Sequence, residues 1–325
     1  MIKISSSTAL DRPIVEWLAH QRALGRDYAN EERVLDSLRW FVARFHAPDL
    51  DQVGFDLWCD TLRHLDANTR RARQRIVHKF CLYRQRSEST CFVPNPLYFA
   101  RLHPGRSPII VGPEQVAHML KATEGLAPTN SSPLLPAVMR LAIVILYTAG
   151  LRRGELLRLT LDDVEPRAGI LRIRCSKFHK SRLVPLSPDA GDELRAYLRK
   201  RLVPPLDTSP HSPLLCNVHG GLRGYTGTGL SAGIHALFKT AGVRNSEGRR
   251  PRIHDLRHSF AVQALIRWYM EGADVQSNLP KLAMYMGHVS IVSTAHYLHF
   301  VPALVALASD RFEKSFGDLI EETAR

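Results

Sequence analysis

The sequence predicts a mainly α-helical protein with a small antiparallel β-sheet, divided into two domains. Apolar residues recur at helical spacing over most of the chain. Two short stretches, 170–174 and 182–186, alternate apolar and polar residues as the strands of a hairpin do. A segment rich in proline, Pro94–Val111, interrupts the periodic pattern as linkers do. A chain of 325 residues also exceeds what one small core usually holds.

The region before the proline-rich segment should be helical over residues 12–88. We expect Val15, Leu18 and Leu24 in an opening amphipathic stretch. The next apolar face follows i, i+3, i+4, i+7 spacing in Val34, Leu35, Leu38, Phe41 and Val42. Residues 69–86 form a further helix candidate. Residues 1–106 are therefore predicted to be a helical domain, with its linker at about 94–111.

The second domain should span residues 107–325 and mix helices with the hairpin. Pro113 in a first turn, beside Glu114, is typical of a helix start. A strongly apolar helix is expected over 134–149, ending near Gly150, with a short helix over 153–159. The remainder should be mostly helical, with breaks at 219–229, Gly242, Gly272 and Gly287. Residues 268–279 look like a surface insertion.

Charge and cysteine usage narrow the function classes. There are 44 Lys and Arg against 31 Asp and Glu, a formal charge of +13 and a pI near 9.8, which favours a polyanionic partner. The strongest apolar run, Leu141–Leu146, is far shorter than the roughly 20 residues of a membrane span. The N-terminus lacks the apolar core of a secretory signal. Five scattered cysteines without a C-x-x-C pair indicate a reducing cytoplasm.

Two basic tracts are candidate nucleic-acid surfaces. Residues 70–86 hold seven Lys and Arg and no acidic residue, and Arg71, Arg75 and Lys79 share one helical face. Residues 167–182 hold six Lys and Arg, again with no acid. A solvated face is the structural alternative, but cationic faces without acidic partners also bind phosphates. The residues that we expect to contact DNA are Arg70, Arg71, Arg75, Lys79, Lys180 and Arg182.

Five short segments of the second domain carry polar residues that could act on a phosphate. T-A-G-L-R-R-G-E-L places an arginine at a helix start, where backbone N–H groups also attract anions. H-D-L-R-H-S-F-A sets a histidine and an arginine on one helical face, with His258 pointing elsewhere. The other segments are C-S-K-F-H-K-S-R-L-V-P-L, M-G-H and S-T-A-H-Y-L-H-F. Each has an ordinary structural explanation when taken alone. Their candidate residues are, in order, Arg152, Lys177, His254, Arg257, His288 and Tyr297.

In this order and wording, the segments resemble the tyrosine recombinase (phage integrase) family over residues 112–300. The resemblance implies a two-domain tyrosine recombinase architecture, a helical core-binding domain followed by a mixed α/β catalytic domain. It implies a site-specific recombinase that cuts and rejoins double-stranded DNA. A chain with these two domains and no evident arm-binding domain suggests a mobile element, in integration, excision or transposition.

The resemblance also implies the roles of the residues. Arg152 and Arg257 would clamp the phosphate, with His288 as a further donor, while Glu155 supports the site. Tyr297 would attack phosphorus to give a 3′-phosphotyrosine. His254 would accept the phenol proton or hydrogen-bond the phosphate. Lys177 would protonate the leaving 5′-oxygen, with Lys180 as the alternative. One phosphoester replaces another, so neither ATP nor a metal is needed, and no cofactor is expected.

The expected partners are double-stranded DNA and further recombinase chains. The family forms tetramers on DNA, homo- or hetero-, and we expect a C-terminal helix at roughly 303–320 to dock onto a neighbour through Leu304, Leu307, Phe312 and Phe316. The expected location is the cytoplasm, at the nucleoid, with no membrane partner. Two other functions remain open: a DNA-relaxing enzyme like the type IB topoisomerases, and a non-catalytic DNA-binding protein of the same fold.

Overall fold

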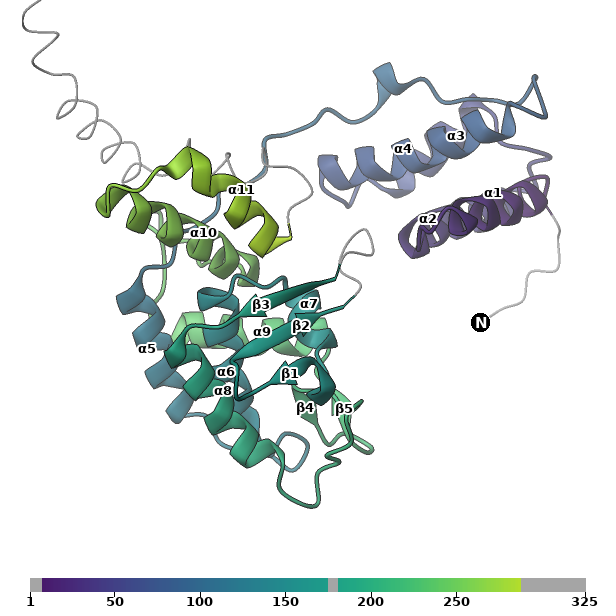
Figure 1. The fold of residues 1–325 in the computed structure, drawn as a ribbon. Helices are drawn as coiled ribbons and strands as arrows, with labels where there is room; N and C mark the ends of the chain where they lie inside the picture. The colour runs from purple at the N-terminus through teal and green to yellow at the C-terminus, as the bar shows by residue number, and fades with distance from the viewer. Residues whose placement is uncertain (1–7, 175–180, 288–325) are drawn as a thin grey trace, which may run out of the picture. The chain divides into compact units, whose positions relative to one another are not determined.

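The computed structural model describes residues 8–174 and 181–287. These residues form two compact units, one on each side of the Arg106–Ser107 bond, which are described separately. In the described ranges, no helix is long and apolar enough to cross a membrane. Most of both units is helical, and the strands form small antiparallel sheets (Figure 1), so the predicted fold class is confirmed.

Over residues 8–106, the first unit contains four α-helices and a short 3₁₀ turn, η1 (Pro96–Tyr98). The helices are α1 (Asp11–Ala23), α2 (Ala29–Arg44), α3 (Gln52–Thr61) and α4 (Ala67–Arg84). Asp51 and Asp66 begin α3 and α4 by accepting hydrogen bonds from Gly54 N and Thr69 N, at 2.7 and 3.0 Å. The apolar faces bury Leu35, Leu38 and Phe80 together. The predicted face of α2 and the predicted helix at 69–86 are therefore both present.

The predicted amphipathic stretch at the start of the chain is helix α1, which buries one face. Ile14, Trp17 and Leu18 enter the core, whereas Val15 and Leu24 are exposed. Residues three or four apart share a helical face, so the face that holds Ile14 and Leu18 turns Val15 away. Leu24 lies just past the last helical residue. The predicted amphipathic stretch is therefore present as α1, and Leu18 is the one of the three named residues that its buried face includes.

The first part of the proline-rich segment is held against α4. Asn68 exchanges two 2.9 Å hydrogen bonds with the backbone of His103. The Gln74 side chain accepts a 3.0 Å bond from Ala100 N, and Phe99 is buried beside them. Residues 99–103 therefore belong to the packed body of the first unit.

The second unit contains seven α-helices and five short strands among its described residues. Its helices are α5 (Pro113–Glu124), α6 (Leu135–Thr148), α7 (Arg153–Arg158), α8 (Pro188–Arg201), α9 (Gly227–Thr240), α10 (Ile253–Met270) and α11 (Val275–Met286), with a 3₁₀ turn, η2 (Leu161–Asp163). Its strands are β1 (Val164–Glu165), β2 (Ile170–Ile173), β3 (Arg182–Pro185), β4 (Cys216–Asn217) and β5 (Arg223–Gly224).

The predicted hairpin is the pair β2–β3, with Leu171 opposite Val184. The sequence pattern missed β1, which adds an outer strand to form the order β1–β2–β3. It also missed the β4–β5 pair, of which β5 lies in the predicted break at 219–229. Strands of two residues are too short to show alternation, so their pairing is decided by neighbouring chain segments.

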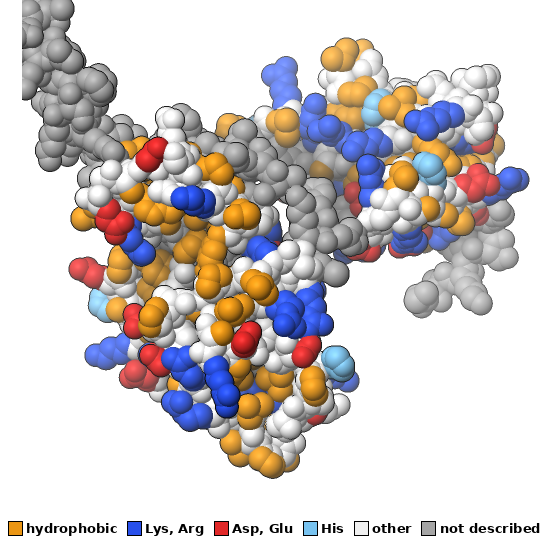
Figure 2. Space-filling model, in the orientation of Figure 1, with side chains coloured by type: hydrophobic (Ala, Val, Ile, Leu, Met, Phe, Trp, Pro, Cys, Tyr) orange, Lys and Arg blue, Asp and Glu red, His pale blue; other side chains and the backbone are white. Residues whose placement is uncertain are grey.

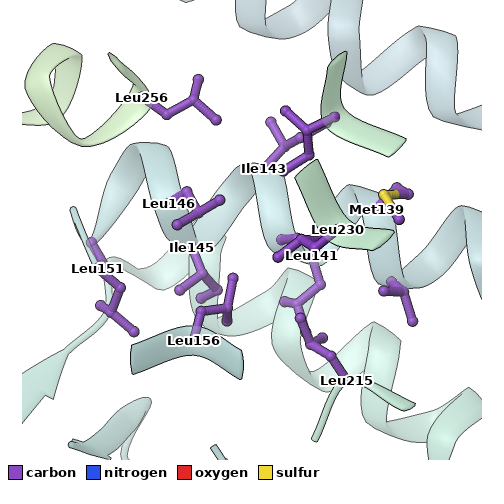
Figure 3. Close-up of a cluster of buried hydrophobic side chains, with 14 of the residues drawn as sticks. Met139, Leu141, Ile143, Ile145, Leu146, Leu151, Leu156, Leu215, Leu230 and Leu256 are labelled. Carbon is purple, nitrogen blue, oxygen red and sulfur yellow. The ribbon is translucent and has the colours of Figure 1, made fainter. Parts of the chain in front are cut away.

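Helix α6 is the centre of the second unit. It packs against α5, α8, α9 and α10, and most of its side chains are buried, which explains why its sequence is apolar on all sides. Figure 3 shows Ile145 and Leu146 of α6 near Leu151 and Leu156, which flank the start of α7. This packing fixes the start of α7 relative to α6.

Residues 268–279 are not a surface insertion. Helix α10 continues to Met270, the chain turns at Gly272, where φ is +69°, and α11 begins at Val275. Val275 and Leu279 are buried in a cluster that includes Leu265 of α10. The prediction was wrong because Glu271, Gly272 and Asp274 mark a turn in the sequence, whereas the packing of the residues after that turn onto α10 is a tertiary contact.

Candidate active site

Arg152 is placed by the turn that follows α6. Gly150 follows the end of α6 in the left-handed region, with φ +59°. A larger residue would clash there, because an added Cβ would lie 2.3 Å from the Phe260 ring. Arg152 then caps α7 in an extended conformation, and its N–H donates to Glu155 Oε2 at 2.9 Å. Its Nη1 donates to Glu155 Oε1 at 2.7 Å, and its Nη2 donates to the Gly287 carbonyl at 2.7 Å. With 26% of its side chain exposed, this guanidinium reaches solvent while being held from two sides.

Arg257 comes from the second turn of α10 and is almost fully buried, at 1% exposure. Its Nη1 donates to the Gly150 carbonyl at 2.5 Å, and its Nη2 donates to the Met286 carbonyl at 2.7 Å. Both carbonyls lie at helix ends, where the helix dipole favours a cation. Arg257 thereby joins the ends of α6 and α11.

Glu155 is the acidic centre of this cluster, and its side chain is 2% exposed. It binds Arg152 and also accepts a forked pair of bonds from Arg182, at 3.1 Å to Oε1 and 2.9 Å to Oε2. Arg257 Nη1 lies 3.9 Å from Glu155 Oε2. Burial raises the pKa of Glu155, but the hydrogen bonds and charges of Arg182 and Arg152 outweigh it and bring this pKa to about 2. Glu155 is therefore a carboxylate at neutral pH.

His254 and His258 form a pair on the first turns of α10. Their rings meet edge to face, with centroids 4.7 Å apart, so His258 does not point away from His254 as predicted. The pKa of His254 is lowered by desolvation and then by the positive charges of Arg257 and Arg152, although its side chain reaches the surface. Desolvation and the charge of His254 lower the pKa of His258 to about 4. Neutral imidazoles at pH 7 are what a proton acceptor requires.

The structure thus brings together Arg152, Arg257 and His254 of the six predicted catalytic residues. Lys177, His288 and Tyr297 lie outside the described residues, as does Lys180. Motif reasoning placed Glu155 in a supporting role. It did not indicate that Arg182, expected among the DNA contacts, directs its guanidinium at Glu155.

The basic tract of the first unit lies on α4. Arg75 and Lys79 are exposed, whereas Arg70 and Arg71 are half-buried. Arg71 Nη1 donates to the Ala100 carbonyl at 3.0 Å. Figure 2 shows Lys and Arg side chains, in blue, on the visible faces of both units. Across the described ranges, no group of three or more His, Cys, Asp and Glu residues could hold a metal ion.

A helical unit followed by a mixed unit with this order of elements is the fold of two-domain tyrosine recombinases. The Tn1549 transposon integrase, solved with a circular intermediate DNA, matches with a TM-score of 0.63 at 17% identity, covering 94% of this chain and 100% of that chain. The XerH site-specific recombinase, solved with a palindromic difH substrate after cleavage, matches with a TM-score of 0.59 at 18% identity, covering 86% and 78%.

The chain belongs to the phage integrase family, whose model matches residues 111–302. A protein of Sinorhizobium fredii described as an integrase/recombinase, y4rE, is 33% identical over 306 residues, which are 93% of this chain and 95% of that protein. Tyrosine recombinase XerD of Ralstonia nicotianae is 28% identical over 239 residues, 73% of this chain and 71% of that protein. Membership of this family supports recombinase activity at specific DNA sites.

Proposed function

We propose that this chain cuts and rejoins double-stranded DNA for a mobile element through a 3′-phosphotyrosine intermediate. Residues 107–325 would be the catalytic domain and residues 1–106 the core-binding domain, acting on DNA in the cytoplasm. The names of the relatives support this proposal: they include integrases, recombinases and a transposon integrase bound to DNA. No cofactor enters the reaction.

The observation that carries the proposal is the charge balance around Glu155. Three guanidiniums surround one buried carboxylate, which leaves two positive charges in excess. A phosphodiester in nucleophilic attack gains negative charge on its non-bridging oxygens, and preorganised guanidiniums stabilise that charge. Arg152 reaches solvent at this cluster, and so can meet a phosphate that arrives from outside.

The proposed steps balance without a further reactant. The Tyr297 oxygen bonds to phosphorus as the bond from phosphorus to the 5′-oxygen breaks. His254 accepts the phenol proton, or holds the phosphate, and Lys177 or Lys180 protonates the departing 5′-oxygen. His288 donates to the phosphate. Attack by the 5′-hydroxyl of another strand reverses these steps and releases the tyrosine.

Covalent capture on nicked duplexes tests the proposed function. Duplexes from the flanks of the chain's own gene are incubated with the protein, and the products are separated on a denaturing gel. We expect a protein–DNA adduct that carries a defined fragment and leaves a free 5′-hydroxyl. No adduct with any flank, together with salt-sensitive binding, would support the non-catalytic DNA-binding protein. Relaxation of a supercoiled plasmid without such a flank would support the topoisomerase-like enzyme.

DNA contacts of the first unit are proposed for α4, through Arg70, Arg71, Arg75 and Lys79, with Lys180 adding to the second unit. Arg75→Gln with Lys79→Gln should make the slope of log K against log salt less steep by about 2, because each lost phosphate contact removes about 0.9. Fluorescence anisotropy with a 30-base-pair duplex measures this slope. Arg12→Gln, an exposed arginine on α1 paired with Glu16, is the control. Equal salt slopes for the wild type and the variant with both Arg75→Gln and Lys79→Gln would contradict the proposed DNA face.

Assembly into a homo- or hetero-tetramer on DNA is proposed as well, with residues 303–320 docking onto a neighbouring chain. A hollow of about 700 Å³ on the second unit supports it, with aromatic walls from Tyr147, Phe260 and Trp268 and cationic Arg267 and Lys281. Native mass measurement on a duplex with two half-sites should show more than one chain. Removal of residues 303–325 should leave single chains on each half-site, and unchanged assemblies would contradict the docking.

A further inference from the structure

Arg182 begins β3, but its guanidinium lies within the cluster around Glu155. It is 13% exposed. Its two Nη atoms grip the two carboxylate oxygens of Glu155, at 3.1 and 2.9 Å, and its Nε donates to the Tyr285 carbonyl at 2.8 Å. One planar group therefore ties β3 to the start of α7 and to the last turn of α11.

Gly287 lies directly against this guanidinium. A Cβ at Gly287 would lie 2.8 Å from Arg182 Nη1 and 3.0 Å from its Cζ, so only glycine allows the close approach. The same residue ends α11 with φ +69°, and its carbonyl accepts the bond from Arg152 Nη2. Arg182 and Arg152 thus bond the same backbone segment, at Tyr285 and Gly287, and both also bond Glu155.

The geometry of these bonds argues against a phosphate contact by Arg182. All three of its nitrogen atoms donate to protein oxygens, and little of the side chain reaches solvent. The side chain of Arg152 is twice as exposed as that of Arg182. A single side-chain nitrogen of Arg152, Nη1, bonds Glu155. Without Arg182, Glu155 could rotate toward Arg152 and Arg257. Its negative charge would then neutralise the positive charge with which these two arginines would bind a phosphate.

We propose that Arg182 is a positioning residue of this site: it holds Glu155 and the end of α11 so that Arg152 and Arg257 stay directed at one phosphate. The inference rests on the proposed function, because a phosphate is the ligand that the two arginines would share. A lysine cannot replace Arg182, since one ammonium cannot fork to two carboxylate oxygens while bonding a carbonyl on another element.

Arg182→Lys and its matched control Arg199→Lys test the inference. Arg199 is an exposed arginine on α8, in the same unit and outside both basic tracts. Arg182→Lys should slow single-turnover adduct formation at saturating nicked duplex by about 100-fold, because small misplacements of charged groups cost that much. Its duplex affinity and salt slope should stay at the wild-type values. Arg199→Lys should react at the wild-type rate.

A coupling measurement separates positioning from a loss of general stability. Arg182→Gln combined with Glu155→Gln should react no more slowly than the slower single variant, because both changes remove the same forked pair. Additive losses would overturn the inference. So would an Arg182→Lys protein that reacts normally but has a salt slope less steep by about 1, the result expected of a phosphate contact.

Calorimetric measurement of orthovanadate binding tests the positioning role without requiring DNA cleavage. Failure of the inference can therefore be distinguished from failure of the proposed function. If the wild type forms no adduct, the proposed function fails. Wild-type vanadate binding that weakens about tenfold in Arg182→Lys, and not in Arg199→Lys, would still support positioning of an oxyanion site. Equal vanadate affinities in the wild type and Arg182→Lys, or no vanadate binding by the wild type, would overturn the inference.

Discussion

Replacing Tyr297 with phenylalanine is expected to abolish covalent capture of DNA while leaving DNA affinity unchanged. The change removes one oxygen, the atom that would bond to phosphorus, and keeps the aromatic ring. Loss of a nucleophile reduces turnover on the order of 10⁴-fold or more, which takes the adduct below detection on a denaturing gel. Anisotropy with the same duplex should give the wild-type affinity.

Tyr98→Phe is the matched control, because Tyr98 is 83% exposed and lies in the first unit. It should form the adduct at the wild-type rate. Tyr285, whose carbonyl accepts a bond from Arg182 in the cluster, is a poor nucleophile. Its hydroxyl donates to the Pro185 carbonyl at 2.9 Å, and burial raises its pKa to about 12, against a smaller opposing effect of Arg182. An adduct formed by Tyr297→Phe would contradict the assignment of the nucleophile.

Glu155→Gln should destabilise the second unit by about 3–5 kcal/mol, the usual cost of removing one partner from a buried ion pair. The amide keeps the size of the side chain, but it cannot neutralise Arg152 and Arg182 or accept both forks. Urea unfolding, monitored by hydrogen exchange of the amides in α6 and α10, measures the loss of stability in the second unit by itself. Glu165→Gln, at an exposed position on β1, should leave stability unchanged.

The same carboxylate predicts a pH dependence with a definite sign. The pKa of Glu155 is about 2 in the folded chain against an ordinary value of 4.5. A lowered carboxyl pKa stabilises the fold fully above pH 4.5, and this contribution is lost as the pH falls toward 2. The difference corresponds to about 3 kcal/mol. Glu155→Gln should remove this part of the acid sensitivity, and an unchanged acid profile would contradict the role of the buried carboxylate.

Sequence patterns were most informative where a feature is local or where several motifs occur in a set order. The apolar run at 134–149 predicted α6, and the alternation at 170–174 and 182–186 predicted the β2–β3 hairpin. The motif order identified Arg152, His254 and Arg257, which the fold gathers around α7 and α10. A motif records which residue types a reaction needs, so it identifies residues without showing their contacts.

The patterns failed where the deciding contact is distant in sequence. The amphipathic pattern of α1 did not show which face is buried: Val15 is exposed, because α1 packs against α4 through the face that holds Ile14 and Leu18. Residues 268–279 were taken for an insertion, yet Val275 and Leu279 complete an apolar cluster with α10. Hydrophobicity alone does not say which partner surface will cover a side chain.

Composition, periodicity and short motifs were enough to assign the family, the fold class and the residue types available for phosphate chemistry. The partners that those residues bind follow from the way the chain packs. The Arg152 guanidinium meets a carbonyl 135 positions away, at Gly287, and Arg182 meets Glu155 across 27 positions. Such contacts form when α6, α7, β3, α10 and α11 pack around one core. A buried charge must then take the partners that this packing supplies.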